Sequence, residues 1–184
     1  TVDSDTSTSD TCLLISTNRS KNKKINNFHD KFLNNFKKCI SNIMLDLAKQ
    51  IVIDGEGAKK IIEIRVENAE SISSAKNIAF SIANSPLVKT AIAGEDANWG
   101  RIVMAIGKSY EPIDQNKIKI KFGKYLVTKN GMRHSKYSEK KLSEYLKNKE
   151  ISILIDIGMG NHNWTVYTCD LTEQYIRINA DYRS

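Results

Sequence analysis

The sequence predicts a layered α/β fold, a sandwich in which helices flank mixed β-sheet. Short segments in which apolar and polar residues alternate indicate strands, and longer segments with an apolar residue every three or four positions indicate helices. Hydrophobic residues make up 40% of the 184 residues and charged residues 27%, as in an ordinary globular protein. Because no repeat, low-complexity tract or long linker divides the sequence, we expect residues 1–184 to form a single α/β domain segment.

The first third of the sequence predicts one strand and one long helix. Residues 12–17, CLLIST, form a short apolar run that is typical of a buried strand. After a polar loop, apolar residues recur every three or four positions from about Phe28 to Ile53, which predicts a helix with one apolar face. That face needs a partner surface. Two glycines in the sequence DGEGA, Gly55 and Gly57, end the helix.

The middle of the sequence alternates between the two periodicities. Apolar residues alternate with charged ones over residues 62–66, which is the period of a half-buried strand. The spacing over residues 75–82 predicts a second helix that ends at an Asn-Ser-Pro sequence. A turn-rich segment, residues 91–100, then leads into a short helix over residues 101–106.

The last third predicts two pairs of strands, each followed by a helix. Strands over residues 118–122 and 125–128 pair around Gly123, and a helix follows over residues 138–146. The sequence GMGNHN then joins strands over residues 151–157 and 164–169, and we expect it to form a hairpin turn.

The final helix is predicted from Leu171 to about Tyr182. Asp170 stands in the N-cap position, and Glu173 three residues later completes a variant of the capping box. The spacing of Tyr175, Ile178 and Tyr182 predicts the inner face of this helix.

The composition argues against several classes of protein. Lys and Arg exceed Asp and Glu by 28 to 21, but the lysines are scattered and few aromatic residues lie among them, so we expect no nucleic-acid partner. No apolar run reaches the roughly 20 residues that cross a bilayer, and the polar N-terminal segment is no signal peptide. Three widely spaced cysteines predict reduced thiols in a cytoplasmic protein, and no spacing of Cys or His predicts a metal site.

Two candidate nucleophiles occur near the start of the sequence. The string VDSDTS presents Asp3 and Asp5 at the spacing of phosphohydrolases that form an aspartyl-phosphate, in which one carboxylate attacks and the other acts as acid. Thr1 is the first residue, and an N-terminal threonine can attack with its own α-amine as the base. A phosphohydrolase therefore stays open as an alternative, and magnesium-dependent release of phosphate would identify it. The excess of basic residues leaves a basic RNA-binding module as a second alternative, which salt-sensitive RNA retention would identify.

Two further segments carry candidate binding residues. Glu56 stands between two glycines, where the backbone can approach a ligand closely and the carboxylate can bind an ammonium group. The sequence GEDANWGR presents Asn98, Trp99 and Arg101 at a junction between loop and helix, where site residues and core residues are equally expected.

Four blocks in this order resemble the ornithine acetyltransferase family of arginine biosynthesis, whose members are also called glutamate N-acetyltransferases. The blocks are TVDSDTSTSDT, DGEGAKKIIEIRV, LVKTAIAGEDANWGRI and TCDLTEQYIRINADYRS. The resemblance runs from Thr1 to Ser184 and implies the self-processing fold of that family. It also implies that the sequence is most of the second, beta chain of the enzyme, without its N-terminal part.

This resemblance implies a reaction and its partners. Acetyl passes from N-acetylornithine to glutamate through an acetyl-threonine ester, and acetyl-CoA is a possible further substrate, with no cofactor. The nucleophilic threonine is expected upstream of Thr1, so no catalytic residue is expected within residues 1–184. The partner is the alpha chain cut from the same precursor, in a heterotetramer of two alpha and two beta chains.

The family's substrate-binding residues can be carried over at three positions. Glu56 matches the binding glutamate of the DGEGA block, and Asn179 and Ser184 match the binding asparagine and hydroxyl residue of the last block. We expect Glu56 to bind a substrate ammonium group, and the other two to form hydrogen bonds with polar groups of the substrate. Three residues depart from the family's usual pattern: Ser4, Ser9 and Lys59. Lys59 lies close to Glu56 and bears on substrate preference.

Overall fold

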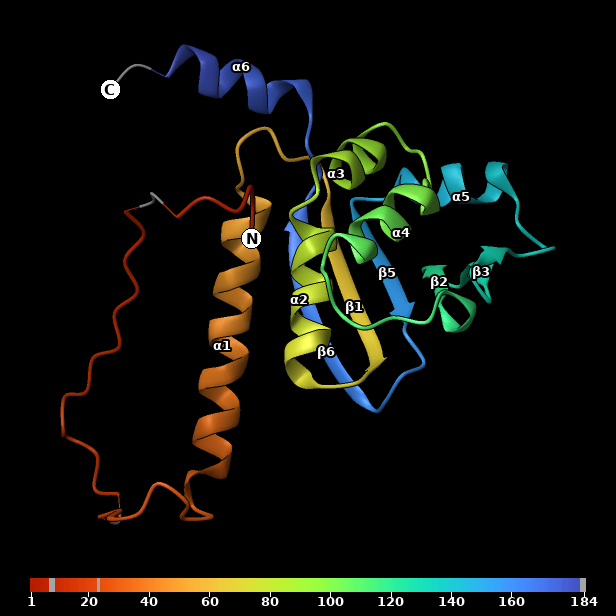
Figure 1. Ribbon diagram of the computed structural model, residues 1–184. Helices are drawn as coiled ribbons and strands as arrows, with labels where there is room; N and C mark the ends of the chain where they lie inside the picture. The colour runs from red at the N-terminus through yellow and green to blue at the C-terminus, as the bar shows by residue number, and fades with distance from the viewer. Residues whose placement is uncertain (7–8, 23, 183–184) are drawn as a thin grey trace. The chain divides into compact units, whose positions relative to one another are not determined.

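The computed structural model describes residues 1–184 except 7–8, 23 and 183–184 (Figure 1). The chain divides into two compact units. The larger unit comprises Thr1–Ser4 and Ile51–Ser184, and the smaller unit comprises Asp5–Gln50.

A six-stranded mixed sheet forms the centre of the larger unit, with the order β4-β3-β2-β5-β1-β6 among the described residues (Figure 1). Its strands are β1 (Ile61–Ala69), β2 (Lys119–Phe122), β3 (Tyr125–Lys129), β4 (Met132–Arg133), β5 (Glu150–Asp156) and β6 (His162–Cys169). Strands β1 and β5 are parallel, and the other neighbours are antiparallel. The layered α/β architecture predicted from the sequence is therefore confirmed.

Helices cover one face of this sheet. They are α2 (Ile72–Ala83), α3 (Pro86–Ala93), α4 (Trp99–Gly107) and α5 (Glu139–Leu146), with a short 3-10 turn at Gln115–Lys117. Helix α6 (Glu173–Asp181) follows β6, buries no side chain and extends away from the sheet (Figure 1). Helix α2 packs against β1 and β6, and α4 packs against α2 (Figure 1). The helices predicted over residues 75–82, 101–106 and 138–146 are confirmed.

The alternation in β1 separates the two faces of the sheet. Ile62, Ile64 and Val66 are buried in the core between sheet and helices. On the opposite face, Arg65 Nη2 lies 2.7 Å from Glu67 Oε1, so the charged residues pair beside solvent. Burying each of the three apolar side chains contributes roughly 1.5–3 kcal/mol, so β1 is a major source of the stability of the sheet.

Helix α3 was not predicted, although the sequence carries its start signal. Ser85 accepts a hydrogen bond from the Val88 amide at 3.4 Å, and Pro86 occupies the first turn, where its missing N–H costs nothing. The residues expected to form a turn-rich segment thus include the end of α3. The glycine and charged residues that suggested turns begin only at Gly94.

The predicted hairpin between β5 and β6 is wrong. Both strands pair with β1, one on each side, so the link between them crosses the end of β1. The amides of Met159 and Gly160 both donate to the Asn68 carbonyl at 2.8 Å. A Cβ at Gly160 would lie 2.4 Å from the Ala69 carbonyl oxygen, so the glycine permits this close crossing. The link is tight, as predicted, but β1 lies between the two strands that it joins.

The predicted cap of the last helix is also wrong. Helix α6 begins at Glu173, its N-cap residue is Thr172, and no side chain caps it. Asp170 is buried and accepts hydrogen bonds from the amides of Lys59 and Lys60 instead. Those two amides lie on the segment that leads into β1, and they compete successfully for the carboxylate.

In the smaller unit, the long helix begins later than predicted. Helix α1 is Leu33–Ile53, and residues 28–29 and 31–32 just before it form turns. The Asp30 side chain accepts from the Phe32 amide at 2.9 Å, and its carbonyl accepts from the Leu33 amide at 3.0 Å. An aspartate that bonds to nearby amides favours a turn over helix and explains why Phe28 lies outside α1.

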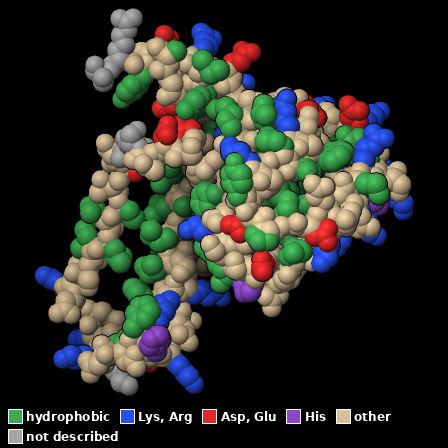
Figure 2. Space-filling view, in the orientation of Figure 1, with side chains coloured by type: hydrophobic (Ala, Val, Ile, Leu, Met, Phe, Trp, Pro, Cys, Tyr) green, Lys and Arg blue, Asp and Glu red, His purple; other side chains and the backbone are tan. Residues whose placement is uncertain are grey.

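The strand predicted for residues 12–17 is wrong. The segment forms no regular secondary structure, and Leu13, Leu14 and Ile15 are 76–80% exposed. An apolar run becomes a strand only where a neighbouring edge satisfies its amides and carbonyls, and the described residues of this unit form no strand that could do so. Figure 2 shows hydrophobic side chains at the surface of this unit; those of α1 that are exposed include Phe36, Ile43 and Met44.

Candidate functional site

Two of the three predicted binding residues meet in the larger unit. Glu56 follows α1 in the DGEGA loop, and Asn179 lies on α6. Asn179 Nδ2 donates to Glu56 Oε2 at 2.5 Å and to the Tyr175 carbonyl at 3.0 Å. Both side chains are exposed, so a solute can reach them. Ser184, the third predicted residue, lies outside the described residues.

Gly57 lets the loop approach α6 closely. Its φ of +69° is a conformation that glycine adopts readily. A Cβ at this position would lie 2.7 Å from both Gln174 Cβ and the Tyr175 amide nitrogen. The Thr172 hydroxyl donates to the Gly57 carbonyl at 2.7 Å. The loop therefore lies against the first turn of α6, and this packing puts Glu56 beside Asn179.

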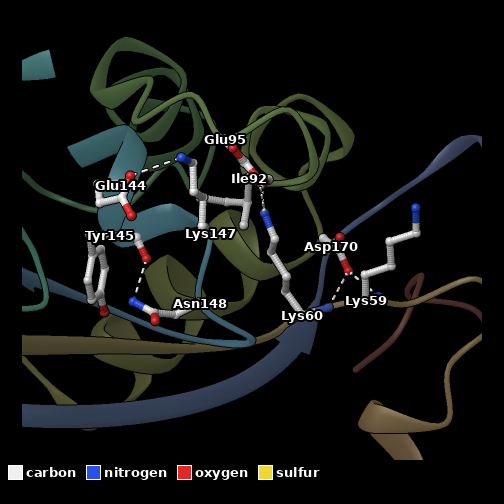
Figure 3. Close-up of polar contacts among 9 residues, drawn as sticks. All are labelled: Lys59, Lys60, Ile92, Glu95, Glu144, Tyr145, Lys147, Asn148 and Asp170. Carbon is white, nitrogen blue, oxygen red and sulfur yellow. Dashed lines mark hydrogen bonds and ion pairs between the residues drawn. The ribbon is translucent and has the colours of Figure 1, made fainter. Parts of the chain in front are cut away.

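Asp170 fixes the other end of the loop. Its Oδ1 accepts from the amides of Lys59 and Lys60 at 2.8 and 2.9 Å, and Figure 3 shows the carboxylate facing both nitrogens. The Lys60 side chain turns away, and its Nζ donates to the Ile92 carbonyl at 3.1 Å and lies 3.8 Å from Glu95 Oε1. The residues on both sides of the loop are thus held by buried or half-buried polar contacts.

A buried lysine lies behind Asp170. Lys89 on α3 is 2% exposed, and its Nζ donates to the Val2 carbonyl at 2.6 Å, the Cys169 carbonyl at 2.6 Å and Thr168 Oγ1 at 2.9 Å. Burial lowers the pKa of Lys89 below its ordinary value, against the opposing effects of Cys169 and the carboxylate of Asp170. Three oxygen acceptors for three N–H donors satisfy the ammonium group, which offsets part of its desolvation.

The first residues of the chain join the same region. Tyr175 Oη donates to Asp3 Oδ2 at 2.8 Å, and Thr1 Oγ1 donates to Asn84 Oδ1 at 2.9 Å. Asp3 thus bonds to α6, while Asp5, its predicted partner in a phosphohydrolase, belongs to the smaller unit.

The other candidates from the sequence have structural contacts. Asn98 caps α4 by accepting from the Arg101 amide at 3.2 Å, and Arg101 Nη1 donates to the Leu87 carbonyl at 2.8 Å. Trp99 packs against the core. Burial raises the pKa of the Cys169 thiol, which keeps it protonated. These residues support the fold around the loop.

A cavity of about 530 Å³ lies on another side of α6. Lys59, Thr172 and Arg177 are among its lining residues, whereas Glu56 and Asn179 are not. The described residues contain no cluster of three or more Cys, His, Asp or Glu that could hold a metal ion. No helix among them is long and apolar enough to span a membrane.

Sequence reasoning did not identify Lys89 or Asp170 as parts of this region. Asp170 was assigned to a helix cap, and Lys89 stands in an apolar helix where its burial has no sequence signal of its own. The one available signal is Ser85, which is typical of a helix N-cap. A helix that begins after Ser85 has Lys89 among its buried residues Val88, Ala91 and Ile92.

Comparisons with known proteins agree on one family. The sequence matches the ArgJ family over residues 1–184. It is 52% identical over 184 residues to the arginine biosynthesis bifunctional protein ArgJ of Caulobacter vibrioides, and 52% identical over 187 residues to that of Brucella suis. These matches cover all of this chain but 46% and 45% of those proteins, so the chain spans about half the length of these relatives.

A solved structure has the same fold. The crystal structure of arginine biosynthesis bifunctional protein argJ from Bacillus halodurans is 40% identical, with a TM-score of 0.91. The match covers 99% of this chain and 85% of that one. With its whole length matched in sequence and nearly all of it in structure, the chain belongs to the ArgJ family.

Proposed function

We propose that this chain is part of an acetyltransferase of arginine biosynthesis that transfers acetyl from N-acetylornithine to glutamate. The match to the ArgJ family along the whole chain carries this proposal. The relatives from Caulobacter vibrioides and Brucella suis are named for a bifunctional role in arginine biosynthesis, which supports the pathway.

In the proposed reaction, a threonine hydroxyl attacks the acetyl carbonyl of N-acetylornithine. A C–O ester bond forms, the C–N amide bond breaks, and the hydroxyl proton passes to the leaving amine of ornithine. The α-amine of glutamate then attacks the ester, which gives N-acetylglutamate and restores the hydroxyl. We expect the nucleophilic threonine upstream of Thr1. We also propose that the partner of this chain is the alpha chain of the same precursor, in a heterotetramer of two alpha and two beta chains. Acetyl-CoA as a further acetyl donor stays a prediction.

The role proposed for this chain is to bind the amino-acid part of the substrate. Glu56 offers an exposed carboxylate that suits the side-chain ammonium of N-acetylornithine. Asn179 donates to this carboxylate at 2.5 Å and still has an amide oxygen that can accept a hydrogen bond. Ser184 is proposed as a third contact on the match of its sequence block alone.

The test is acetyl transfer by the full-length protein that contains this sequence. We expect transfer from N-acetylornithine to glutamate, and we expect Glu56→Gln to raise the KM for N-acetylornithine about 10- to 100-fold, because a charge-assisted hydrogen bond is worth roughly 1.5–3 kcal/mol. The substituted amide still accepts from Asn179, so the loop keeps its contact and only the charge is lost.

Asp54→Asn is the matched control, since it removes an exposed carboxylate from the same loop two residues away. Its KM should equal that of the wild type. An unchanged KM in Glu56→Gln would exclude Glu56 as the ammonium ligand. A wild-type protein that transfers no acetyl, but releases phosphate with magnesium or retains RNA at low salt, would refute the proposed function.

A further inference from the structure

We propose that Lys89 is a positioning residue, which holds the DGEGA loop and α6 in the arrangement that brings Glu56 to Asn179. The buried Lys89 ammonium group ties the start of the chain to the end of β6, from which both the loop and α6 are fixed. The inference rests on the proposed function, because the position of Glu56 matters only where Glu56 binds substrate.

The contacts of Lys89 join two segments that are far apart in the sequence. Its Nζ donates to the carbonyl of Val2 and to the carbonyl of Cys169, both at 2.6 Å. A third donor reaches Thr168 Oγ1 at 2.9 Å. One ammonium group thus binds the first residues of the chain to the last two residues of β6.

The next residue along the chain passes this constraint to the loop. Asp170 follows Cys169 directly, and its carboxylate accepts from the amides of Lys59 and Lys60 at 2.8 and 2.9 Å (Figure 3). The Asp170 amide donates back to the Lys60 carbonyl at 3.2 Å. Lys59 is three residues beyond Glu56, so a shift at Cys169 moves the anchor of the loop.

The same anchor sets the start of α6. The Leu171 amide donates to the Lys89 carbonyl at 3.3 Å, and the Thr172 hydroxyl donates to the Gly57 carbonyl at 2.7 Å. Helix α6 begins one residue later and carries Asn179. Both partners of the Glu56–Asn179 contact therefore depend on the segment that Lys89 holds.

The chemistry of this position requires a group with several N–H donors. The acceptors around Nζ are two backbone carbonyls and a hydroxyl, and the carboxylate of Asp170 contributes attraction from close by. An apolar residue of the same length leaves those carbonyls without donors and Asp170 as a buried charge without its neighbour. Buried acceptors that lose their donor draw in water or move, and either response loosens the end of β6.

The test uses Lys89→Met in the full-length protein, with Lys119→Met as control. Methionine has nearly the length of lysine and no donor. Lys119 on β2 also makes a polar contact, 2.8 Å from Asp156 Oδ2, but it touches neither Val2 nor the end of β6. Thr168→Val is a milder second variant, which removes one acceptor of the ammonium group and retains the charge, in case Lys89→Met does not fold.

Hydrogen exchange and steady-state kinetics are measured on each variant. In Lys89→Met we expect the amides of Lys59 and Lys60 to exchange at least about 10-fold faster, while amides of β1 and β5 change no more than in Lys119→Met. The KM for N-acetylornithine should rise about 10-fold with a smaller change in kcat, as expected for loss of substrate positioning. Thr168→Val should shift both quantities in the same direction by less.

The two hypotheses fail in different ways. Exchange at Lys59 and Lys60 that matches Lys119→Met would overturn the positioning role, whatever the kinetics show. A KM that stays at the wild-type value, with faster exchange at these amides, would also overturn it, because the loop would then move without effect on substrate. A wild-type protein without acetyl transfer refutes the proposed function instead, and exchange alone then decides whether Lys89 holds the loop.

Discussion

The sheet is held together by different interactions from the region in which Asp170 joins the DGEGA loop to the start of α6. We call this region the junction. In the sheet, β1 is fixed by apolar side chains such as Ile62 and Ile64, which are 1% and 0% exposed. In the junction, the loop is fixed by side chains that bond to backbone atoms, chiefly Lys89 and Asp170. Apolar packing tolerates small adjustments, whereas a hydrogen bond to one backbone atom sets a position, so the second kind suits a region that must hold a ligand.

The largest expected loss of stability lies in the sheet. Ile64→Ala removes a fully buried side chain from β1 and should lower the free energy of unfolding by about 2–5 kcal/mol, as transfer and cavity costs add. Urea unfolding of the full-length protein measures this loss. Because the junction is fixed separately, we expect the KM of the folded variant to stay near the wild-type value. A KM that rises with the loss of stability would show that the two regions are not independent.

In the junction, we expect the substitution Gly57→Ala to cost less stability than Ile64→Ala but to weaken substrate binding more. Gly57→Ala puts a Cβ 2.7 Å from Gln174 Cβ and the Tyr175 amide, at a φ of +69°. This strain should cost about 1–3 kcal/mol and raise the KM for N-acetylornithine, because α6 must move away from Glu56. Thermal unfolding and steady-state kinetics measure the two effects.

Gly107→Ala is the matched control for that substitution. A Cβ at Gly107 meets nothing within 4 Å, and the residue ends α4 without the positive φ of Gly57. Alanine there should leave the KM unchanged and stabilise the helix by up to roughly 1 kcal/mol. Equal effects of the two alanines would contradict the close approach of the loop to α6.

The same contrast separates what the sequence predicted from what it did not. The strands over residues 62–66 and 151–157 followed from apolar periodicity and are confirmed. Periodicity does not identify neighbours, so the predicted hairpin between β5 and β6 was wrong even though both strands exist. Pairing with β1 depends on contacts between distant parts of the sequence, which a local pattern does not record.

Side chains that bond to a distant backbone were the hardest to predict. Asp170 has the spacing of a helix cap, and a local rule assigned it to α6, yet its partners are the amides of Lys59 and Lys60 more than a hundred residues earlier. Glu56 and Asn179 were proposed together only on the resemblance to a family, and the structure brings them within 2.5 Å. Without that resemblance, nothing in the sequence connects the two residues.

The smallest expected effect tests a polar contact of the sheet at low pH. Burial raises the pKa of Asp156, but hydrogen bonds from Lys119 and Asn68 outweigh it, so the pKa of this carboxyl lies below its ordinary value of 3.8. A folded-state pKa below the unfolded one contributes stability that is fully present above about pH 4 and is lost as the pH falls through the folded value.

Lys119 is 40% exposed, so we expect Lys119→Met to cost no more than about 1 kcal/mol at pH 7. The difference from wild type should shrink as the pH falls below 4 in urea unfolding, and a difference that grows instead would mean that Lys119 does not stabilise the ionised carboxylate. Because this contact joins β2 to β5 and not the loop to α6, its loss should leave the binding of N-acetylornithine unchanged at every pH at which the protein stays folded.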